Sequence, residues 1–113
     1  MGDESINELT TIYRLELYDL ATTAKDVNFR EVWNDPQSIG VELGIRAGCV
    51  LARHSAAVPI KVTCLSGSGD FSYGDELENT STIDEGTVIA LDARIPHEVS
   101  AHRDLHLLVI KFK

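Results

Sequence analysis

The side chains best suited to chemistry in this sequence are its histidines, and two of the four, His54 and His97, have similar surroundings. An imidazole can bind a metal ion or transfer a proton near neutral pH. Each of the two lies beside a tight turn and follows a predicted strand that begins near a glycine, Gly48 in one case and Gly86 in the other. This repetition predicts two hairpins of one β-structure that present His54 and His97 to a common interior.

The other histidines and the two cysteines are less distinctive. His102 lies in a polar loop pattern, where solvent exposure is expected, and His106 begins an apolar segment whose register leaves its direction open. Cys49 and Cys64 are the only cysteines, and they do not form a Cys-x-x-Cys pair. We expect both thiols to behave as small buried apolar groups rather than as a disulfide or a redox pair.

Acidic residues gather between residues 67 and 86, and the neighbouring segment 66–69 is rich in glycine. The acidic residues lack the spacing of a calcium-binding loop, so a solvated rim of loops is expected. The glycine-rich segment lacks the Lys-Ser/Thr pair and the helix start of a phosphate-binding loop. Neither feature therefore predicts a site.

Alternation of apolar and polar residues predicts strands along most of the chain, most clearly at 39–45. Turn signals recur roughly every 8–12 residues, and no helix pattern exceeds a turn or two. Residues 19–28 are expected to hold at most one helical turn, and 76–83 are predicted to be a polar connection. The predicted strands cover residues 12–18, 29–33, 39–45, 49–54, 59–65, 70–73, 87–91, 97–101 and 105–112. The fold class is therefore all-β, a sandwich or barrel.

Length and charge narrow the classes of protein further. The 113 residues are expected to form one domain, 1–113, with residues 1–10 as a tail. The net charge is −8 and no segment concentrates Lys or Arg, which disfavours nucleic-acid and anionic membrane partners. No apolar run approaches the length of a membrane span, and the first 30 residues show no signal-peptide pattern. A cytoplasmic location is expected.

The segments 48–67 and 86–101 resemble the two sequence motifs of the cupin superfamily. Five residues coincide in register with those motifs, namely Gly48, His54, Gly67, Gly86 and His97. The resemblance extends over about residues 39–112. It implies a jelly-roll β-barrel of two antiparallel sheets, formed by a small single-domain cupin.

This chain departs from the family pattern at the positions that usually bind metal. The usual site has three histidines and one glutamate, but the second histidine position is Ala56 and the glutamate position is Ile60, or Lys61 on a longer spacing. The resemblance therefore implies either no metal or one divalent ion, Fe, Mn, Ni, Cu or Zn. Such an ion would be held by His54, His97 and a third ligand such as His106, a cysteine or solvent.

Three interpretations of the histidines remain open. They are structural groups in an apolar cavity, or metal ligands, or part of a pocket for a small organic ligand, for example an anion held with Arg46 or Arg53. Strand alternation puts Cys64 on the same face as Ile60, so Cys64 is also a candidate. The candidate pocket residues are Arg46, His54, Ile60, Cys64 and His97.

These interpretations correspond to three classes of function. The first is a small-molecule-binding or sensing cupin of unknown ligand with a partly lost metal site. The second is a metal-dependent oxygenase or isomerase, and the third is a non-catalytic interaction domain, which a blocked or very small pocket would favour. A homodimer is also expected, because the predicted strand at Ile12–Tyr18 could pair with another copy and close a sheet edge.

Overall fold

The computed structural model describes residues 10–113, and within them the chain forms nine strands and no helix. No helix in this part of the chain is long and apolar enough to span a membrane. The predicted tail at residues 1–10 lies almost wholly outside the described residues. The strands are β1 (Val27–Asn34), β2 (Ser38–Ile45), β3 (Val50–His54), β4 (Ile60–Ser66), β5 (Ser68–Tyr73), β6 (Asn79–Asp84), β7 (Val88–Leu91), β8 (His97–Ala101) and β9 (Leu105–Phe112).

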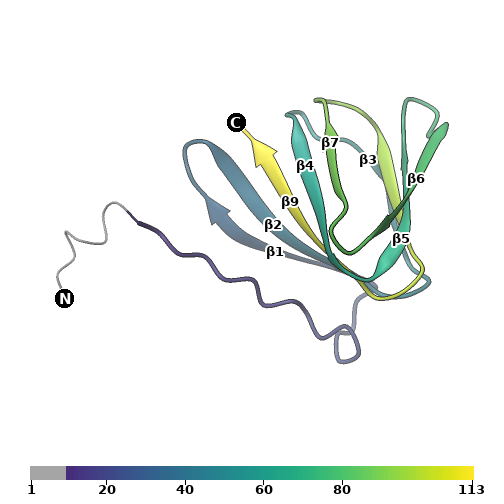
Figure 1. Cartoon of the computed structure of the whole chain (residues 1–113), viewed down its shortest axis with the longest axis horizontal. Coiled ribbons are helices and arrows are strands. Elements are labelled where there is room, and N and C mark those ends of the chain that lie inside the picture. The colour runs from purple at the N-terminus through teal and green to yellow at the C-terminus, as the bar shows by residue number, and fades with distance from the viewer. Residues whose placement is uncertain (1–9) are drawn as a thin grey trace.

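The strands form two antiparallel sheets that face each other (Figure 1). The larger sheet has the order β1-β2-β9-β4-β7, and the smaller sheet has the order β3-β8-β5-β6. Neighbours in space are mostly not neighbours in sequence, as expected for a jelly roll, in which the chain crosses between the sheets. The predicted all-β jelly-roll fold is confirmed.

Alternation along the strands fills the space between the sheets with aliphatic and aromatic side chains. In β2 the residues Leu43 and Ile45 face inward, and in β9 the residues Leu105 and Leu107 do so. Successive side chains of a strand point to opposite faces, so one apolar residue in two is enough to build this core. The buried core consists of Leu43, Ile45, Ile60, Val62, Cys64, Phe71, Ile83, Leu91, Val99, Ala101, Leu105 and Leu107.

The stretch predicted to be a polar connection contains a strand, β6. It is an edge strand paired with β5 from Ser68–Asp84 to Tyr73–Asn79. Only Ile83 of its six residues is buried, so the alternation that identifies other strands is nearly absent. The prediction for residues 76–83 is therefore wrong over most of this segment, because backbone pairing rather than core burial holds it.

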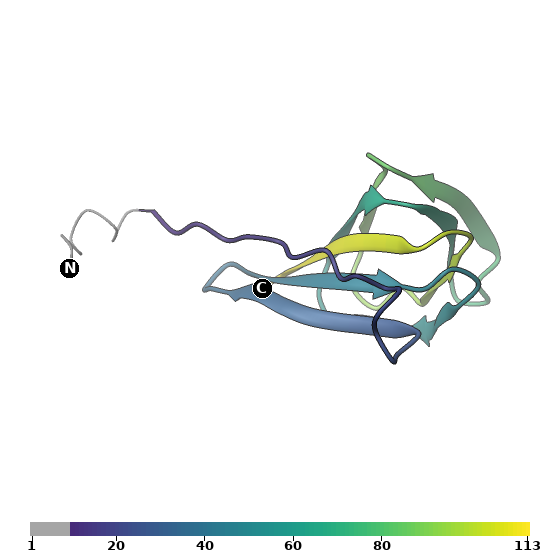
Figure 2. The same ribbon diagram turned by 90° about the horizontal axis from the view of Figure 1, so that it is seen from below.

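The segment Ile12–Tyr18, predicted as a strand, pairs with no strand within the described residues. It runs as an extended arm along the outside of the larger sheet, where Tyr13 stacks on Trp33, and its first described residues project beyond the sheet (Figure 2). The arm has the alternation of a strand but no neighbouring strand in this molecule to share hydrogen bonds with. The following residues form a single turn, in which the Thr22 amide donates to the Asp19 carbonyl at 3.1 Å. The first strand of the larger sheet, β1, begins at Val27, which is before the segment 39–112 covered by the family resemblance.

A buried carboxylate fastens this arm to the barrel. Glu42 of β2 points to the outer face of the larger sheet, and the arm covers its side chain completely. Its carboxylate accepts hydrogen bonds from the amide of Glu16 at 2.9 Å, the amide of Leu17 and the guanidinium of Arg30 at 3.0 Å. Burial alone would raise the pKa of Glu42, but these donors together lower it.

Candidate functional site

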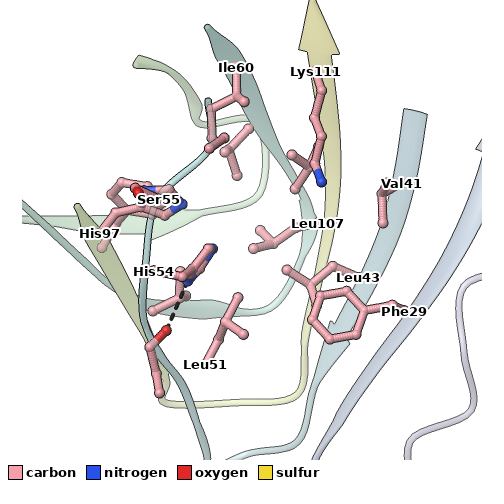
Figure 3. A pocket seen from close by; sticks show the side chains of 16 residues that line it. Phe29, Val41, Leu43, Leu51, His54, Ser55, Ile60, His97, Leu107 and Lys111 are labelled. Carbon is pink, nitrogen blue, oxygen red and sulfur yellow. Dashed lines mark hydrogen bonds between the residues drawn. The ribbon is translucent and has the colours of Figure 1, made fainter. Parts of the chain in front are cut away.

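A cavity of about 380 Å³ lies between the two sheets, at the end of the barrel where β3 ends and β8 begins (Figure 3). Its walls are mainly aliphatic and aromatic, and its polar side chains are His54, Ser55, His97 and Lys111. Largely apolar walls with a few polar groups are typical of pockets for small molecules. The apolar lining residues are Phe29, Val41, Leu43, Leu51, Ala52, Ala56, Ile60, Val62, Phe71, Val99, Leu107 and Val109.

The two histidines singled out by the sequence meet in this cavity. His54 on β3 and His97 on β8 are directly paired across the smaller sheet. Their ring centroids are 4.1 Å apart and the rings meet edge to face. His97 is only 4% exposed and stacks on Phe71 with centroids 5.5 Å apart, whereas His54 is exposed on the side of the cavity opening. The pairing of β3 with β8 therefore brings the two motif segments together, as predicted.

Backbone carbonyls set the tautomer of both rings. Nδ1 of His54 lies 2.8 Å from the Ala52 carbonyl, and Nδ1 of His97 lies 2.9 Å from the Ile95 carbonyl. A carbonyl only accepts hydrogen bonds, so each Nδ1 carries the hydrogen and each Nε2 keeps its lone pair. Each ring therefore offers the cavity an acceptor nitrogen.

Burial also keeps His97 uncharged. Removal from water lowers the pKa of His97, and the neighbouring His54 lowers it further, while the hydrogen bond to Ile95 partly opposes the change. The ordinary value for histidine is 6.5, so the neutral ring dominates at pH 7. In that form His97 can accept a hydrogen bond or a proton from a bound molecule.

Lys111 is a cavity-lining side chain that the sequence prediction missed. It lies on β9, and its side chain points into the cavity from the wall opposite the histidines (Figure 3). In the structure Leu105, Leu107 and Val109 face inward at every second position, and Lys111 is the next in that series. Residues 107–110 are all apolar, so the sequence alone did not show which face of β9 carries Lys111.

Two other predicted candidates stay out of the cavity for reasons of register. His106 lies between the buried residues Leu105 and Leu107, so its ring points to the opposite face of the larger sheet. Cys64 does share the inward face of β4 with Ile60, as expected, but it is part of the packed core further along the strand. Its thiol lies 3.6 Å from the Ser66 carbonyl. Only Ile60 of this group lines the cavity.

Arg46 and Arg53, which were predicted to hold an anion in the pocket, contact other residues outside the cavity. Arg46 follows β2, contacts Thr23 and lies 3.9 Å from the Asp26 carboxylate. Arg53 is exposed and donates to the Asp75 carbonyl at 2.5 Å. Neither lines the cavity, so the cation available to a ligand there is Lys111 rather than Arg46 or Arg53.

The cavity has fewer metal-binding side chains than the usual cupin metal site. Ala56 and Ile60, which stand where the resemblance has a histidine and a glutamate, both line the cavity with hydrocarbon. Among residues 10–113 no group of three or more His, Cys, Asp or Glu side chains is placed to hold a metal ion. Catalytic metal sites ordinarily use three protein ligands, and His54 and His97 supply two.

Comparison with known proteins finds likeness in structure only. No protein-family profile and no curated protein sequence matches the chain. An RmlC-like cupin of double-stranded β-helix fold from Methanocaldococcus jannaschii superposes with a TM-score of 0.72 at 12% identity, over 92% of this chain and 91% of that one. A protein of unknown function from Streptococcus pyogenes gives 0.70 at 22% identity, over 92% of both chains. Salicylate 1,2-dioxygenase from Pseudoaminobacter salicylatoxidans gives 0.71 at 15%, over 80% of this chain and 26% of the enzyme.

These likenesses show the fold: the chain has the jelly-roll β-barrel that small cupin proteins share. The fold that the sequence motifs implied is thus confirmed by its neighbours. Because an oxygenase and a protein of unknown function share this fold, the activity must be argued from the cavity itself.

Proposed function

We propose that this cupin binds a small organic molecule with a largely apolar body in the cavity between its sheets. The observation that supports the proposal is a cavity of about 380 Å³ whose apolar walls converge on a few polar groups. A volume of this size does not favour the alternative of an interaction domain, which would need no cavity. Such a pocket serves a protein that binds its ligand or one that senses it.

The two histidines would favour ligands that carry a hydrogen-bond donor. Nε2 of His54 and Nε2 of His97 are acceptors, because both Nδ1 groups are engaged with carbonyls. A ligand hydroxyl or N–H group placed between them would satisfy both nitrogens. Phe71 supports the His97 ring from the core side and limits its movement.

A ligand screen with a blocked pocket tests this proposal. Thermal unfolding is measured with a panel of small organic acids, alcohols and amides for the wild type, Ala56→Leu and Ala90→Leu. Ala56 lines the cavity, whereas Ala90 is exposed on the outer face of β7, so the two variants add the same volume inside and outside the pocket. We expect ligands to stabilise the wild type and Ala90→Leu but not Ala56→Leu. Equal stabilisation of all three, or of none, contradicts the proposal.

A metal-dependent enzyme is the second candidate, and one observation favours it. Both histidines donate Nδ1–H to a carbonyl, an arrangement that in metal sites orients Nε2 toward the ion. Elemental analysis of untagged protein from metal-supplemented growth distinguishes the two. About one metal equivalent per chain, lost in the His54→Ala/His97→Ala variant, would establish the metal site. Metal at background level in the wild type would exclude this candidate and leave the organic ligand.

We also propose that the chain forms a homodimer through its arm. Ile12 is 72% exposed and Leu17 is 46% exposed, although the arm between them has the alternation of a strand. The larger sheet ends at β1, whose outer edge has no neighbour within the described residues. A second copy supplies an open strand edge and a second apolar arm, so a two-fold pairing buries both.

A further inference from the structure

Among the described residues that line the cavity, Lys111 is the cationic one, and its position is fixed by the sheet. β9 is a central strand, and Lys111 is paired with Ile39 of β2 on one side and Ile60 of β4 on the other. Both neighbours are apolar. The side chain therefore extends along hydrocarbon and carries its ammonium group into the cavity (Figure 3).

Within the described residues no carboxylate forms an ion pair with Lys111. Glu31 shares the face of β1 that carries Phe29, yet it forms no ion pair with Lys111 either. Lys111 is half-buried among apolar neighbours, and its ammonium group is open to a partner from the cavity side. An anionic group of a ligand would form a charge pair with it in this partly enclosed space.

The charge distribution of the cavity also orients such a ligand. The histidine wall presents two nitrogen lone pairs, which repel a carboxylate, and the opposite wall presents the ammonium group of Lys111. The rest of the cavity wall is mainly apolar and includes Leu43 and Leu107. An anionic group is therefore favoured at Lys111, and an apolar body toward the centre.

We propose that the ligand is a small carboxylic acid with an apolar body, whose carboxylate pairs with Lys111. A hydroxyl or N–H group at the far end of the ligand would donate to His54 or His97. This inference rests on the proposed function, because it names the ligand class of the same cavity. It makes Lys111 a residue that determines specificity.

The experiment compares acids with their own primary amides, which have nearly the same shape and no charge. The probes are 2-naphthoate, indole-3-acetate and octanoate with the three corresponding amides, measured by isothermal titration calorimetry. We expect wild-type protein to bind at least one acid about tenfold more tightly than its amide, as one partly buried ion pair allows. In Lys111→Met the acid should bind only as tightly as the amide. Lys61→Met is the matched control, because Lys61 is exposed on the outer face of β4 and should leave binding unchanged.

The outcomes separate this inference from the proposed function. If the amides bind as tightly as the acids, or if Lys111→Met keeps the preference for acids, the carboxylate inference is overturned while the binding pocket stands. If no acid and no amide binds the wild type, the carboxylate inference is overturned, and the proposed function is decided by the wider ligand panel with Ala56→Leu. The acid–amide comparison in wild-type protein does not depend on the folding of any variant. Lys111→Glu adds an independent check, since it should bind 2-naphthylmethylamine and reject 2-naphthoate.

Discussion

His54 and His97 occupy paired positions on β3 and β8, with ring centroids 4.1 Å apart, yet only His97 is buried. The two rings therefore have different physical roles despite their symmetry in sequence. His97 stacks on Phe71 and forms part of the wall of the core, whereas His54 closes the pocket from the exposed side. Truncation of His97 should therefore affect the stability of the barrel more than truncation of His54.

The first prediction follows from this difference in burial. His97→Ala should lower the free energy of unfolding by about 2–3 kcal/mol, because it leaves a cavity against Phe71. His54→Ala should cost less than about 1 kcal/mol, since an exposed ring loses little on truncation. Urea denaturation followed by circular dichroism measures both values. Similar costs for the two variants would show that the burial difference does not control stability.

The second prediction concerns the contact between Gly40 of β2 and Trp33 of β1. A methyl group on Gly40 would overlap the six-membered ring of Trp33, which is held by its hydrogen bond to Ser38 at 2.9 Å and by stacking on Tyr13. Gly40→Ala should displace the indole and lower the free energy of unfolding by about 1–3 kcal/mol. Trp33 is the only tryptophan, so a shift of its fluorescence reports the displacement directly.

A double-mutant cycle provides the control for this prediction. In a Trp33→Leu background the ring that Gly40 accommodates is gone, so Gly40→Ala should cost less than in the wild type. An equal cost in both backgrounds would mean that Gly40 is required for some reason other than Trp33. The same cycle removes the stacking on Tyr13, and its effect on the arm can be followed by proteolysis.

Much of the barrel was predictable because most strands bury alternate residues. The segment 39–45 shows this most clearly, and its prediction agrees with β2 (Ser38–Ile45). β6 (Asn79–Asp84) was missed because its single buried residue, Ile83, leaves no alternation to detect. The arm was overpredicted for the opposite reason: Ile12–Tyr18 has the alternation, but pairing depends on a neighbouring strand, which local sequence does not specify.

The site was predictable in part. The spacing of Gly48, His54, Gly86 and His97 indicated that two histidines meet, and they do. Lys111 was missed because its inward direction depends on the register of the last strand. That register is fixed by pairing with β2 and β4, which are distant in sequence.

The third prediction concerns pH and the buried carboxylate of Glu42. Its pKa is lowered below the ordinary value of 4.5 in the folded chain, so the unfolded chain takes up this proton first on acidification. The stabilisation by Glu42 is therefore complete above pH 4.5 and is lost as the pH falls through the lowered value. At pH 7, Glu42→Gln should cost about 2–3 kcal/mol, because it breaks the ion pair with Arg30.

Urea denaturation from pH 7 to pH 3 tests this prediction. The difference in unfolding free energy between the wild type and Glu42→Gln should shrink as the pH falls below 4.5. Trypsin should also cleave after Arg14 faster in Glu42→Gln, because Glu42 holds the amides of Glu16 and Leu17. A pH-independent difference, with unchanged cleavage, would show that Glu42 does not anchor the arm as an ionised group.

The fourth prediction tests the homodimer through the exposed side chains of the arm. Leaving Ile12 and Leu15 in water is unfavourable, so burial against a second copy would favour association. Multi-angle light scattering at tens of micromolar should give a dimer for the wild type and a monomer for Ile12→Ser/Leu15→Ser. Val88→Ser is the matched control, because Val88 is 57% exposed on β7, at the opposite edge of the larger sheet from β1, and this variant should remain a dimer. A wild-type monomer would reject the proposal outright. Dissociation of Val88→Ser, with the arm variant still dimeric, would instead move the interface to the β7 edge.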